Sequence, residues 1–464
     1  MDRATPRRVA VVGGGISGLA AAWFLHQADP TLAVTVFESR PGAGGKLRLG
    51  AVAGVPLDLG AESVLLRRPE GQRLAEAVGL TLVAAETTSA SIWSRGALHP
   101  VPADTLMGVP GSVQSLAASM LLTREELDRV RQDEQLPGEP LTTDVSVADA
   151  VGGRLGQAVL DRLVEPLLGG VYAGRADQLS LRSTLPQLAA RLADQPSVLA
   201  AARAAKAGAP AETGPVFGAP RGGVGLLVGA VARASDAELR TSTTVRELHR
   251  VGAGWELVTG SAADPHRVPA DAVVLAVPPA PAARLLSRVA PAAATALGGI
   301  PTASSAVVAL AYDAAAVRLP EGSGFLVPPV EGLLVKGLTF SSAKWGWHAE
   351  TAPGLVLVRA SVGRFGEEAA LQRDDAELVA AVLADVHRLL GWTAPPVDAV
   401  VQRWGGGLPQ YTVGHADRVA AVRAAVAEVP GLAVCGAAYD GVGIPACIAT
   451  AERSVTGLLR QWAP

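Results

Sequence analysis

The stretch VAVVGGGISG at residues 9–18 decides the fold of the N-terminal part of this 464-residue chain. Its four apolar residues, Val9–Val12, predict a buried strand, and the glycines after them predict a tight turn into a helix. Gly13, Gly15 and Gly18 fit the pattern GxGxxG, which provides the turn, a close backbone approach to a pyrophosphate, and close helix–strand packing. The N-terminus of that helix would offer N–H groups to phosphate. The stretch therefore predicts a dinucleotide-binding turn.

A second apolar run, Val34–Phe37, leads to Glu38, which follows Gly18 by twenty residues. A carboxylate at that point can accept hydrogen bonds from an adenosine ribose, and it would repel a 2′-phosphate. A glycine-rich turn without a ligand is the simpler interpretation, but the strand, helix and distant acid all stand where dinucleotide binding needs them. These residues leave FAD and NAD both open. The second glycine pair and its flanking cations, Arg40–Lys46, favour FAD, which runs deeper into a protein.

Composition narrows the class of protein. The chain is 49% hydrophobic and 18% charged with a net charge of −3, and its length favours two or more domains. Because it has no basic block, we expect neither nucleic acid nor an anionic membrane surface as the main partner. No apolar run reaches the ~18 residues of a membrane span, so we expect no transmembrane segment and at most peripheral membrane contact.

Cysteines and histidines give no sign of a metal or disulfide site. Cys435 and Cys447 lack the spacing of a redox pair or of metal ligands, which fits a cytoplasmic protein without a disulfide. The seven histidines are scattered without ligand spacing, so no metal site is predicted.

The middle of the chain changes character twice. Helical periodicity predicts an insertion of helices at Ser112–Leu121, Arg124–Asp133, Leu155–Leu163 and Leu181–Leu192. The composition of Ala200–Pro215 then predicts a mobile loop. Strand patterns return after this loop, with one amphipathic helix among them: Thr244–Leu248, Trp255–Val258, Asp271–Val277, several runs between Ala303 and Val362, and the helix Asp375–Leu390.

The end of the chain repeats the opening pattern. Leu432–Gly436 predicts a short strand, and Gly441–Pro445 precedes a predicted helix that runs to Leu459. The N-terminus of this helix could meet the same cofactor as the first one. The cofactor-binding domain would then be discontinuous, and the expected division is into residues 1–88, 216–285 and 400–464 for the cofactor, 89–110 and 286–399 for a substrate-binding sheet, and 111–215 for a helical domain.

A family resemblance extends over essentially the whole chain. It is carried by GGGISGL from Gly13, Leu59–Ser63, Glu165–Gly174, Leu179–Thr184, Arg403-Trp404, Leu408–Tyr411 and Asp440–Pro445. On these residues the chain resembles the flavin-dependent porphyrinogen oxidases of haem synthesis, in particular the soluble coproporphyrinogen/protoporphyrinogen oxidases of Gram-positive bacteria. The resemblance implies an α/β fold with a Rossmann-like, two-dinucleotide-binding FAD domain, a mixed-sheet substrate domain and a helical insertion, as in amine-oxidase-like flavoproteins.

The resemblance also implies which residues contact FAD. These are Gly13, Gly14, Gly15, Ile16, Ser17, Gly18, Glu38, Ser39, Arg40, Gly45, Lys46, Gly60, Ala61, Glu62, Ser63, Val245, Trp404, Val442, Gly443 and Ile444. Related amine oxidases can hold the flavin through a cysteine near the segment that matches Trp404–Tyr411. This segment has no cysteine here, so we expect a non-covalent flavin.

The reaction that the resemblance implies removes a hydride from a porphyrinogen methylene bridge to the flavin, releases a proton, and repeats until the ring is aromatic. Molecular oxygen would then reoxidise the flavin and give hydrogen peroxide. Because the cofactor carries this chemistry, no catalytic triad or metal is required, and no catalytic side chain is singled out. The expected activity is oxidation of coproporphyrinogen III to coproporphyrin III, with protoporphyrinogen IX as the alternative substrate.

Four residues are candidates for binding the tetrapyrrole. In the family, the backbone carbonyl that matches Gly170 faces pyrrole N–H groups, and glycine permits that close approach. Arg68, Arg67 and Lys344 could pair with propionates, and Arg68 is favoured because it stands where a related enzyme carries a basic residue. Plant and animal relatives place an arginine around Ala90-Ser91, which this chain lacks.

Two other functions stay open at this point. A flavin amine oxidase or carotenoid desaturase shares the opening and the C-terminal glycine run, although an amine oxidase needs an aromatic cage near Tyr411. A porphyrin carrier that keeps FAD only as a structural group belongs to a different class of protein. Pathway logic also suggests ferrochelatase as a transient partner that receives the product.

Overall fold

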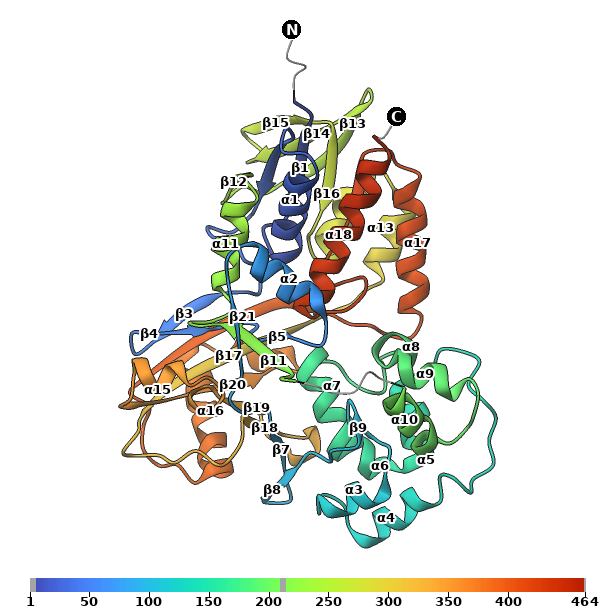
Figure 1. The fold of residues 1–464 in the computed structure, drawn as a ribbon, viewed down its shortest axis with the longest axis vertical. Helices are drawn as coiled ribbons and strands as arrows, with labels where there is room; N and C mark the ends of the chain where they lie inside the picture. Colours follow the sequence, from blue (N-terminus) through green and yellow to red (C-terminus); the bar gives the residue numbers. More distant parts are fainter. Residues whose placement is uncertain (1–5, 209–213, 463–464) are drawn as a thin grey trace.

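A computed structural model describes residues 6–208 and 214–462 of the chain (Figure 1). A parallel sheet with its helices forms the upper part of the molecule in this view, and both described ends of the chain lie there. A seven-stranded sheet and a group of short helices lie side by side below it. The predicted α/β fold, with a parallel Rossmann-like sheet, a mixed sheet and a helical insertion, is confirmed.

The parallel sheet draws its strands from segments far apart in the sequence. Its order is β12-β2-β1-β16-β22, and all four pairings are parallel. The strands are β12 (Glu238–Arg240), β2 (Ala33–Phe37), β1 (Arg8–Val12), β16 (Ala272–Leu275) and β22 (Leu432–Val434). The C-terminal strand thus completes the sheet that the N-terminal strand begins.

Both faces of this sheet are buried, as parallel sheets require. In β1, Val9 and Val11 pack with α1 (Ile16–Ala28), α11 (Leu226–Ala234) and α18 (Ile444–Arg460). Ala10 and Val12 point to the opposite face. That face is covered by the antiparallel sheet β13 (Glu247–Val251), β14 (Gly254–Gly260) and β15 (Pro265–Ala270), and by α12 (Pro279–Leu286), α13 (Pro291–Gly298) and α17 (His415–Ala427).

The seven-stranded sheet has the order β21-β17-β20-β19-β18-β7-β8. On one face, alternate residues of β17, such as Val308 and Leu310, pack against α16 (Asp375–Leu390). The other face carries Ser305, Val307 and Ser361, which line a cavity. The strands are β21 (Asp398–Pro409), β17 (Thr302–Asp313), β20 (Leu355–Val362), β19 (Val335–Phe340), β18 (Gly324–Leu326), β7 (Ala90–Ser94) and β8 (Ala97–Pro100).

The helical region agrees with the sequence in kind but not in detail. Gly156, with φ +93°, interrupts the segment predicted as one helix over Leu155–Leu163, and Pro186 interrupts the one over Leu181–Leu192 because the residue before proline disfavours helix. The helices are α3 (Val113–Ala118), α4 (Arg124–Arg131), α5 (Gly153–Leu155), α6 (Gln157–Val159), α7 (Glu165–Tyr172), α8 (Leu181–Thr184), α9 (Pro186–Leu192) and α10 (Val198–Ala207), with π-helical segments at Ala148–Gly152 and Leu160–Val164.

Two further predictions need correction. The predicted loop Ala200–Pro215 begins inside α10, which the cap of Ser197 on Ala200 N–H and a buried alanine face stabilise; residues 209–213 lie outside the described residues. The predicted strand Thr244–Leu248 begins only at Glu247, because the residues before it turn along the cavity. The domain boundaries stay predictions; β21 runs across residue 400, where one of them was placed.

The remaining elements are short connections around these layers. They are the hairpin β3 (Leu49–Val52) and β4 (Val55–Asp58), the sheet β5 (Val64–Leu65), β11 (Phe217–Pro220) and β6 (Leu82–Ala84), the pair β9 (Thr105–Leu106) and β10 (Val109–Pro110), the helices α2 (Pro69–Ala77), α14 (Ser341–Lys344) and α15 (Trp347–Thr351), and 3₁₀ turns at Pro329–Glu331 and Glu368–Gln372.

Candidate active site

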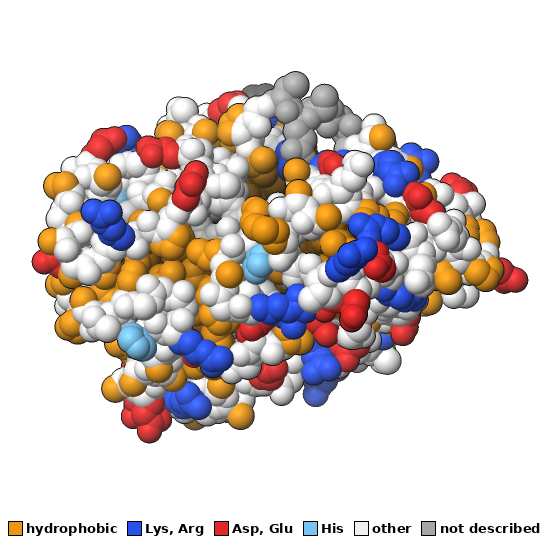
Figure 2. Space-filling view, turned by 90° about the horizontal axis from the view of Figure 1, so that it is seen from below, with side chains coloured by type: hydrophobic (Ala, Val, Ile, Leu, Met, Phe, Trp, Pro, Cys, Tyr) orange, Lys and Arg blue, Asp and Glu red, His pale blue; other side chains and the backbone are white. Residues whose placement is uncertain are grey.

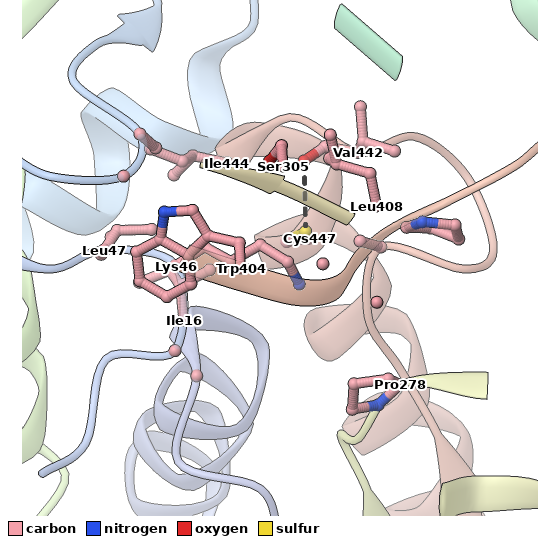
Figure 3. A pocket seen from close by; sticks show the side chains of 18 of the residues that line it. Ile16, Lys46, Leu47, Pro278, Ser305, Trp404, Leu408, Val442, Ile444 and Cys447 are labelled. Carbon is pink, nitrogen blue, oxygen red and sulfur yellow. Dashed lines mark hydrogen bonds between the residues drawn. The ribbon is translucent and has the colours of Figure 1, made fainter. Parts of the chain in front are cut away.

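A cavity of about 1280 Å³ runs from the end of the parallel sheet to the inner face of the seven-stranded sheet. Residues from both ends of the chain line it, and Figure 3 shows Ile16, Lys46, Trp404, Val442 and Ile444 around the same space. On the lower face of the molecule, hydrophobic side chains gather in a hollow (Figure 2). The cavity exceeds the size usual for one small ligand.

The cavity brings together most of the residues that the sequence singled out. They are Gly13, Gly15, Ile16, Ser17, Glu38, Ser39, Arg40, Gly45, Lys46, Gly60, Ala61, Glu62, Val245, Trp404, Val442, Gly443 and Ile444 of the expected cofactor contacts, and Gly170 and Lys344 of the expected substrate contacts. Gly14, Gly18, Ser63, Arg67 and Arg68 do not line it.

The three glycines of the opening turn have different surroundings. A Cβ on Gly13 would lie 2.5 Å from the Ala276 carbonyl oxygen, and one on Gly18 would overlap the Gly13 carbonyl oxygen. Both glycines therefore serve the turn and the helix–strand packing. A Cβ on Gly15 would project into the cavity, with Gly45 Cα, 3.9 Å away, as its nearest neighbour. The space beside Gly15 is therefore open to the cavity.

The Glu38 side chain is hydrogen-bonded to the backbone of the glycine turn. Its carboxylate accepts hydrogen bonds from the backbone N–H groups of Gly14 at 2.9 Å and Arg40 at 2.8 Å. The side chain is buried but lines the cavity, so a remaining lone pair can face a ribose hydroxyl. Gly14 thus holds the carboxylate rather than the ligand.

Two helix N-termini meet at the cavity. Gly15 precedes α1 and Gly443 precedes α18, and neither helix has a side-chain cap. A Cβ on Gly443 would find only the ring of Pro445, at 3.9 Å. Since N–H groups and the helix dipole favour anions at such ends, the two helices and the open glycines fit a dinucleotide pyrophosphate.

Tyr411, which follows β21, is hydrogen-bonded to the backbone between β22 and α18. Its hydroxyl donates to the Ala437 carbonyl at 2.6 Å and accepts from the Gly441 N–H at 2.8 Å, and its ring stacks on His415 with centroids 3.9 Å apart. Burial raises the pKa of Tyr411, so the hydroxyl keeps its proton. The tyrosine is not itself a wall of the cavity.

Replacing Tyr411 by Phe should destabilise the protein by about 1–3 kcal/mol, because two backbone groups lose their buried partner. Tyr312→Phe is the matched control, since that buried hydroxyl has no hydrogen-bond partner. Removing it should change stability little. Urea unfolding of both holoproteins measures the difference, and equal midpoints would contradict this role of Tyr411.

Glu62 forms a buried ion-pair cluster on the cavity wall. It pairs with the Lys344 ammonium at 2.5 Å and with the Arg359 guanidinium, which also donates to the Gly60 carbonyl. Burial alone would raise the pKa of Glu62, but the two cations outweigh burial and lower it to about 2. Lys344 is therefore already paired within the protein.

Arg67 and Arg68, the other predicted propionate contacts, lie beside the cavity rather than in its wall. Arg68 precedes α2 and pairs with Glu70 in the first turn of that helix, at 2.7 Å. Its side chain is 40% exposed. The strand β5, which ends at Leu65 just before these arginines, pairs with β11.

The substrate candidate Gly170 lies in α7 and lines the cavity opposite β18. A Cβ there would meet the Leu326 side chain at 3.4 Å, so glycine leaves room between α7 and the sheet. Sequence reasoning missed two cations of the same wall, Lys336 and Arg359. Their signal was a charge inside the apolar runs Leu333–Thr339 and Leu355–Ala360.

Comparisons with known proteins agree with this geometry. The model of the flavin-containing amine oxidoreductases matches residues 16–459. The chain belongs to this family. It is therefore an oxidoreductase of a flavin-dependent class.

The relatives and one solved structure cover nearly the full length. A coproporphyrinogen III oxidase of Mycobacterium leprae is 41% identical over 98% of both chains. A coproporphyrinogen III oxidase of Bacillus subtilis is 30% identical, again over 98% of each. A crystal structure of an Exiguobacterium protein assigned as a protoporphyrinogen oxidase matches with a TM-score of 0.85 and 33% identity, over 97% of this chain and 98% of that one.

Neither a cluster of metal ligands nor a membrane-spanning helix occurs among residues 6–208 and 214–462. No group of three or more His, Cys, Asp and Glu side chains is arranged to hold a metal ion there. In the same ranges, no helix has the length and apolar character needed to cross a bilayer.

Proposed function

We propose that this protein oxidises coproporphyrinogen III to coproporphyrin III, with FAD as cofactor, molecular oxygen as acceptor and hydrogen peroxide as by-product. The observation that carries the proposal is a single cavity with a dinucleotide cradle at one end and an apolar chamber between α7 and the seven-stranded sheet at the other. Full-length relatives named coproporphyrinogen III oxidase support the choice of substrate.

FAD fits the cradle, and we propose that its contacts are the predicted residues that line the cavity, with Gly14 and Gly18 supporting the turn from outside the wall and Ser63 following the lining residues Gly60–Glu62. The chemistry that bound FAD would supply here is acceptance of a hydride from a methylene bridge of the substrate. Cys447 is the cavity's only thiol among the described residues, and burial raises its pKa, with smaller opposing effects of Ser17 and Lys46. A protonated thiol is a poor nucleophile, which supports a non-covalent flavin.

The chain itself positions the ring and shields it from water. Phe325, Leu326 and Val307 provide apolar surface opposite α7, and the glycine at 170 lets the backbone carbonyl approach the pyrrole N–H groups. Among the lining carboxylates, Glu38 is held by backbone N–H groups and Glu62 by two cations. Neither is placed as a general base, so we assign no catalytic side chain.

Two observations favour this substrate class over the alternatives. Ala90 lines the cavity at the place where protoporphyrinogen-type relatives are expected to carry an arginine. The cavity-lining aromatic residues are Phe37, Phe217, Phe325 and Trp404 among those described, and Tyr411 lies behind the wall. The aromatic cage expected of an amine oxidase is therefore missing from the described wall.

Turnover tests the proposal directly. Purified holoprotein should convert coproporphyrinogen III to a fluorescent product with the mass of coproporphyrin III, and each two-electron step should reduce one oxygen to one hydrogen peroxide. Protoporphyrinogen IX and a set of primary amines are compared in parallel. Binding without bleaching of the flavin under anaerobic conditions would establish a carrier instead, and oxidation of amines alone would establish an amine oxidase.

Cytoplasmic location and transfer of the product to ferrochelatase stay predictions. Co-purification with ferrochelatase at physiological salt would support the second one.

A further inference from the structure

The chain has few lysines, and most of them line the cavity. The chain has 40 Lys and Arg residues, of which four are lysines. Lys46, Lys336 and Lys344 line the cavity, whereas Lys206 lies on α10 of the helical region. The cavity lysines therefore need individual explanations.

Two of the three have an assigned environment. Lys344 pairs with Glu62. Lys46 follows Gly45 in the cofactor cradle and lies beside Trp404 in Figure 3. Lys336 stands apart from both, as the second residue of β19 on the wall that faces α7.

The Lys336 ammonium is buried without an anionic partner. The residue is 6% exposed, and its one hydrogen bond reaches the Gly169 carbonyl at 3.5 Å, the outer limit for such a bond. No carboxylate lies within ion-pair distance of it among the described residues. Its charged neighbour is Arg364, which repels it. Burial and this repulsion lower the pKa of Lys336 to about 7.

A long apolar side chain would fill this place without that cost. A weak bond to one carbonyl offsets little of the free energy needed to bury an ammonium group, which proteins normally supply through a carboxylate or another anion. Because Lys336 opens onto the cavity, the missing anion can come from a ligand. Gly169, its backbone partner, adjoins Gly170, where we place the tetrapyrrole ring.

We propose that the Lys336 ammonium binds a propionate carboxylate of the tetrapyrrole, from the wall between β19 and α7. The inference rests on the proposed function, because that function supplies a ligand with carboxylates at the ring edge. It assigns to Lys336 the anchoring role that sequence reasoning gave to Arg67, Arg68 and Lys344.

Charges on each neighbouring element define how the site responds to pH. Arg364, which follows β20, donates to the carbonyls of Leu333 and Val327. Asp385 on α16 accepts a hydrogen bond from the Val335 N–H. Glu165 on α7 accepts one from the Ala176 N–H. A carboxylate ligand binds the protonated lysine. Its affinity should therefore be highest below the pKa of Lys336 and should fall as pH rises through about 7.

The test compares two ligands that differ only in charge. Binding of coproporphyrin III and of its tetramethyl ester to the holoprotein is measured by fluorescence quenching, and the KM for coproporphyrinogen III is measured beside it. Lys336→Gln should weaken coproporphyrin III binding about 10- to 100-fold, the range of a hydrogen bond to a charged group. Binding of the ester should not change. Lys206→Gln is the matched lysine control and should bind both ligands as the original protein does.

Lys336→Arg keeps the charge without titrating near neutral pH. It should restore most of the affinity and remove the decrease between about pH 6 and pH 8.5 that the original protein shows around its pKa of about 7. Unchanged coproporphyrin III affinity in Lys336→Gln, or equal weakening of acid and ester, would overturn the assignment in favour of a purely structural lysine.

If Lys336→Gln does not fold, the comparison of Lys336→Arg with the original protein across pH decides the question, and identical pH profiles overturn the proposal. An original protein that neither binds coproporphyrin III nor oxidises its porphyrinogen would refute the proposed function itself. If the original protein oxidises coproporphyrinogen III and Lys336→Gln binds coproporphyrin III as tightly as the original protein does, only this inference is refuted.

Discussion

Gly15→Val should yield a folded protein without flavin and without oxidase activity. A Cβ at this position would have Gly45 Cα, 3.9 Å away, as its nearest neighbour, so we expect the apoprotein to tolerate the branched side chain. The backbone at Gly15 has φ −73°, which valine can adopt. The side chain would instead fill the space that we assign to the pyrophosphate. We expect at least a 100-fold loss of FAD affinity, roughly 2.7 kcal/mol or more.

The measurement is the flavin absorbance of the purified protein, followed by titration of the apoprotein with FAD. Gly354→Val is the matched control, because this exposed glycine has an ordinary backbone conformation and open space around its Cβ. It should stay yellow and active. A yellow Gly15→Val protein with normal FAD affinity would show that the cradle lies elsewhere.

Glu62→Gln should destabilise the protein by about 3–5 kcal/mol. The substitution leaves the Lys344 and Arg359 charges buried without their carboxylate, and removing one partner of a buried pair typically has this cost. Glu350→Gln is the matched control, since Glu350 pairs with Arg221 at the surface with 62% of its side chain exposed. Exposed pairs contribute about 0–1 kcal/mol, so this variant should unfold almost normally.

The pH dependence gives the same prediction an independent check. The folded-state pKa of Glu62, about 2, lies below the ordinary 4.5, so its contribution to stability is complete above pH 4.5 and is lost as the pH falls toward 2. The difference in unfolding free energy between the original protein and Glu62→Gln should therefore shrink over that interval. A difference that stays constant down to pH 2 would mean that the cluster does not hold Glu62 ionised.

Strong local patterns predicted the cofactor half of the site. The run from Val9 to Gly18 specifies a strand, a turn and a helix by itself, because the glycines at 13 and 18 are required by contacts within the same βα unit. The helix Asp375–Leu390 was predicted with its observed bounds, since its apolar period and its Asp374 cap and Gly391 end are local signals.

The substrate half depended on contacts that no local pattern contains. Arg68 is a local exception, because Glu70 two residues later pairs with it. Lys344, in contrast, is paired by Glu62 from 282 residues away. In the sequence, Lys336 only interrupts an apolar strand. Its position opposite α7 is given by the tertiary structure. Which charge is free to meet a ligand is decided by its tertiary partners.

By itself, the sequence determined the opening glycine turn, the acid at Glu38 and the helix that begins near Gly443, because each depends on residues that are neighbours along the chain. The tertiary structure alone decided that β22 joins the sheet begun by β1, so that two helix N-termini share one cavity. It also decided which cations remain unpaired in that cavity. Ion pairing and burial bring together residues that are hundreds of positions apart, and a local sequence pattern does not show which of these residues will be in contact.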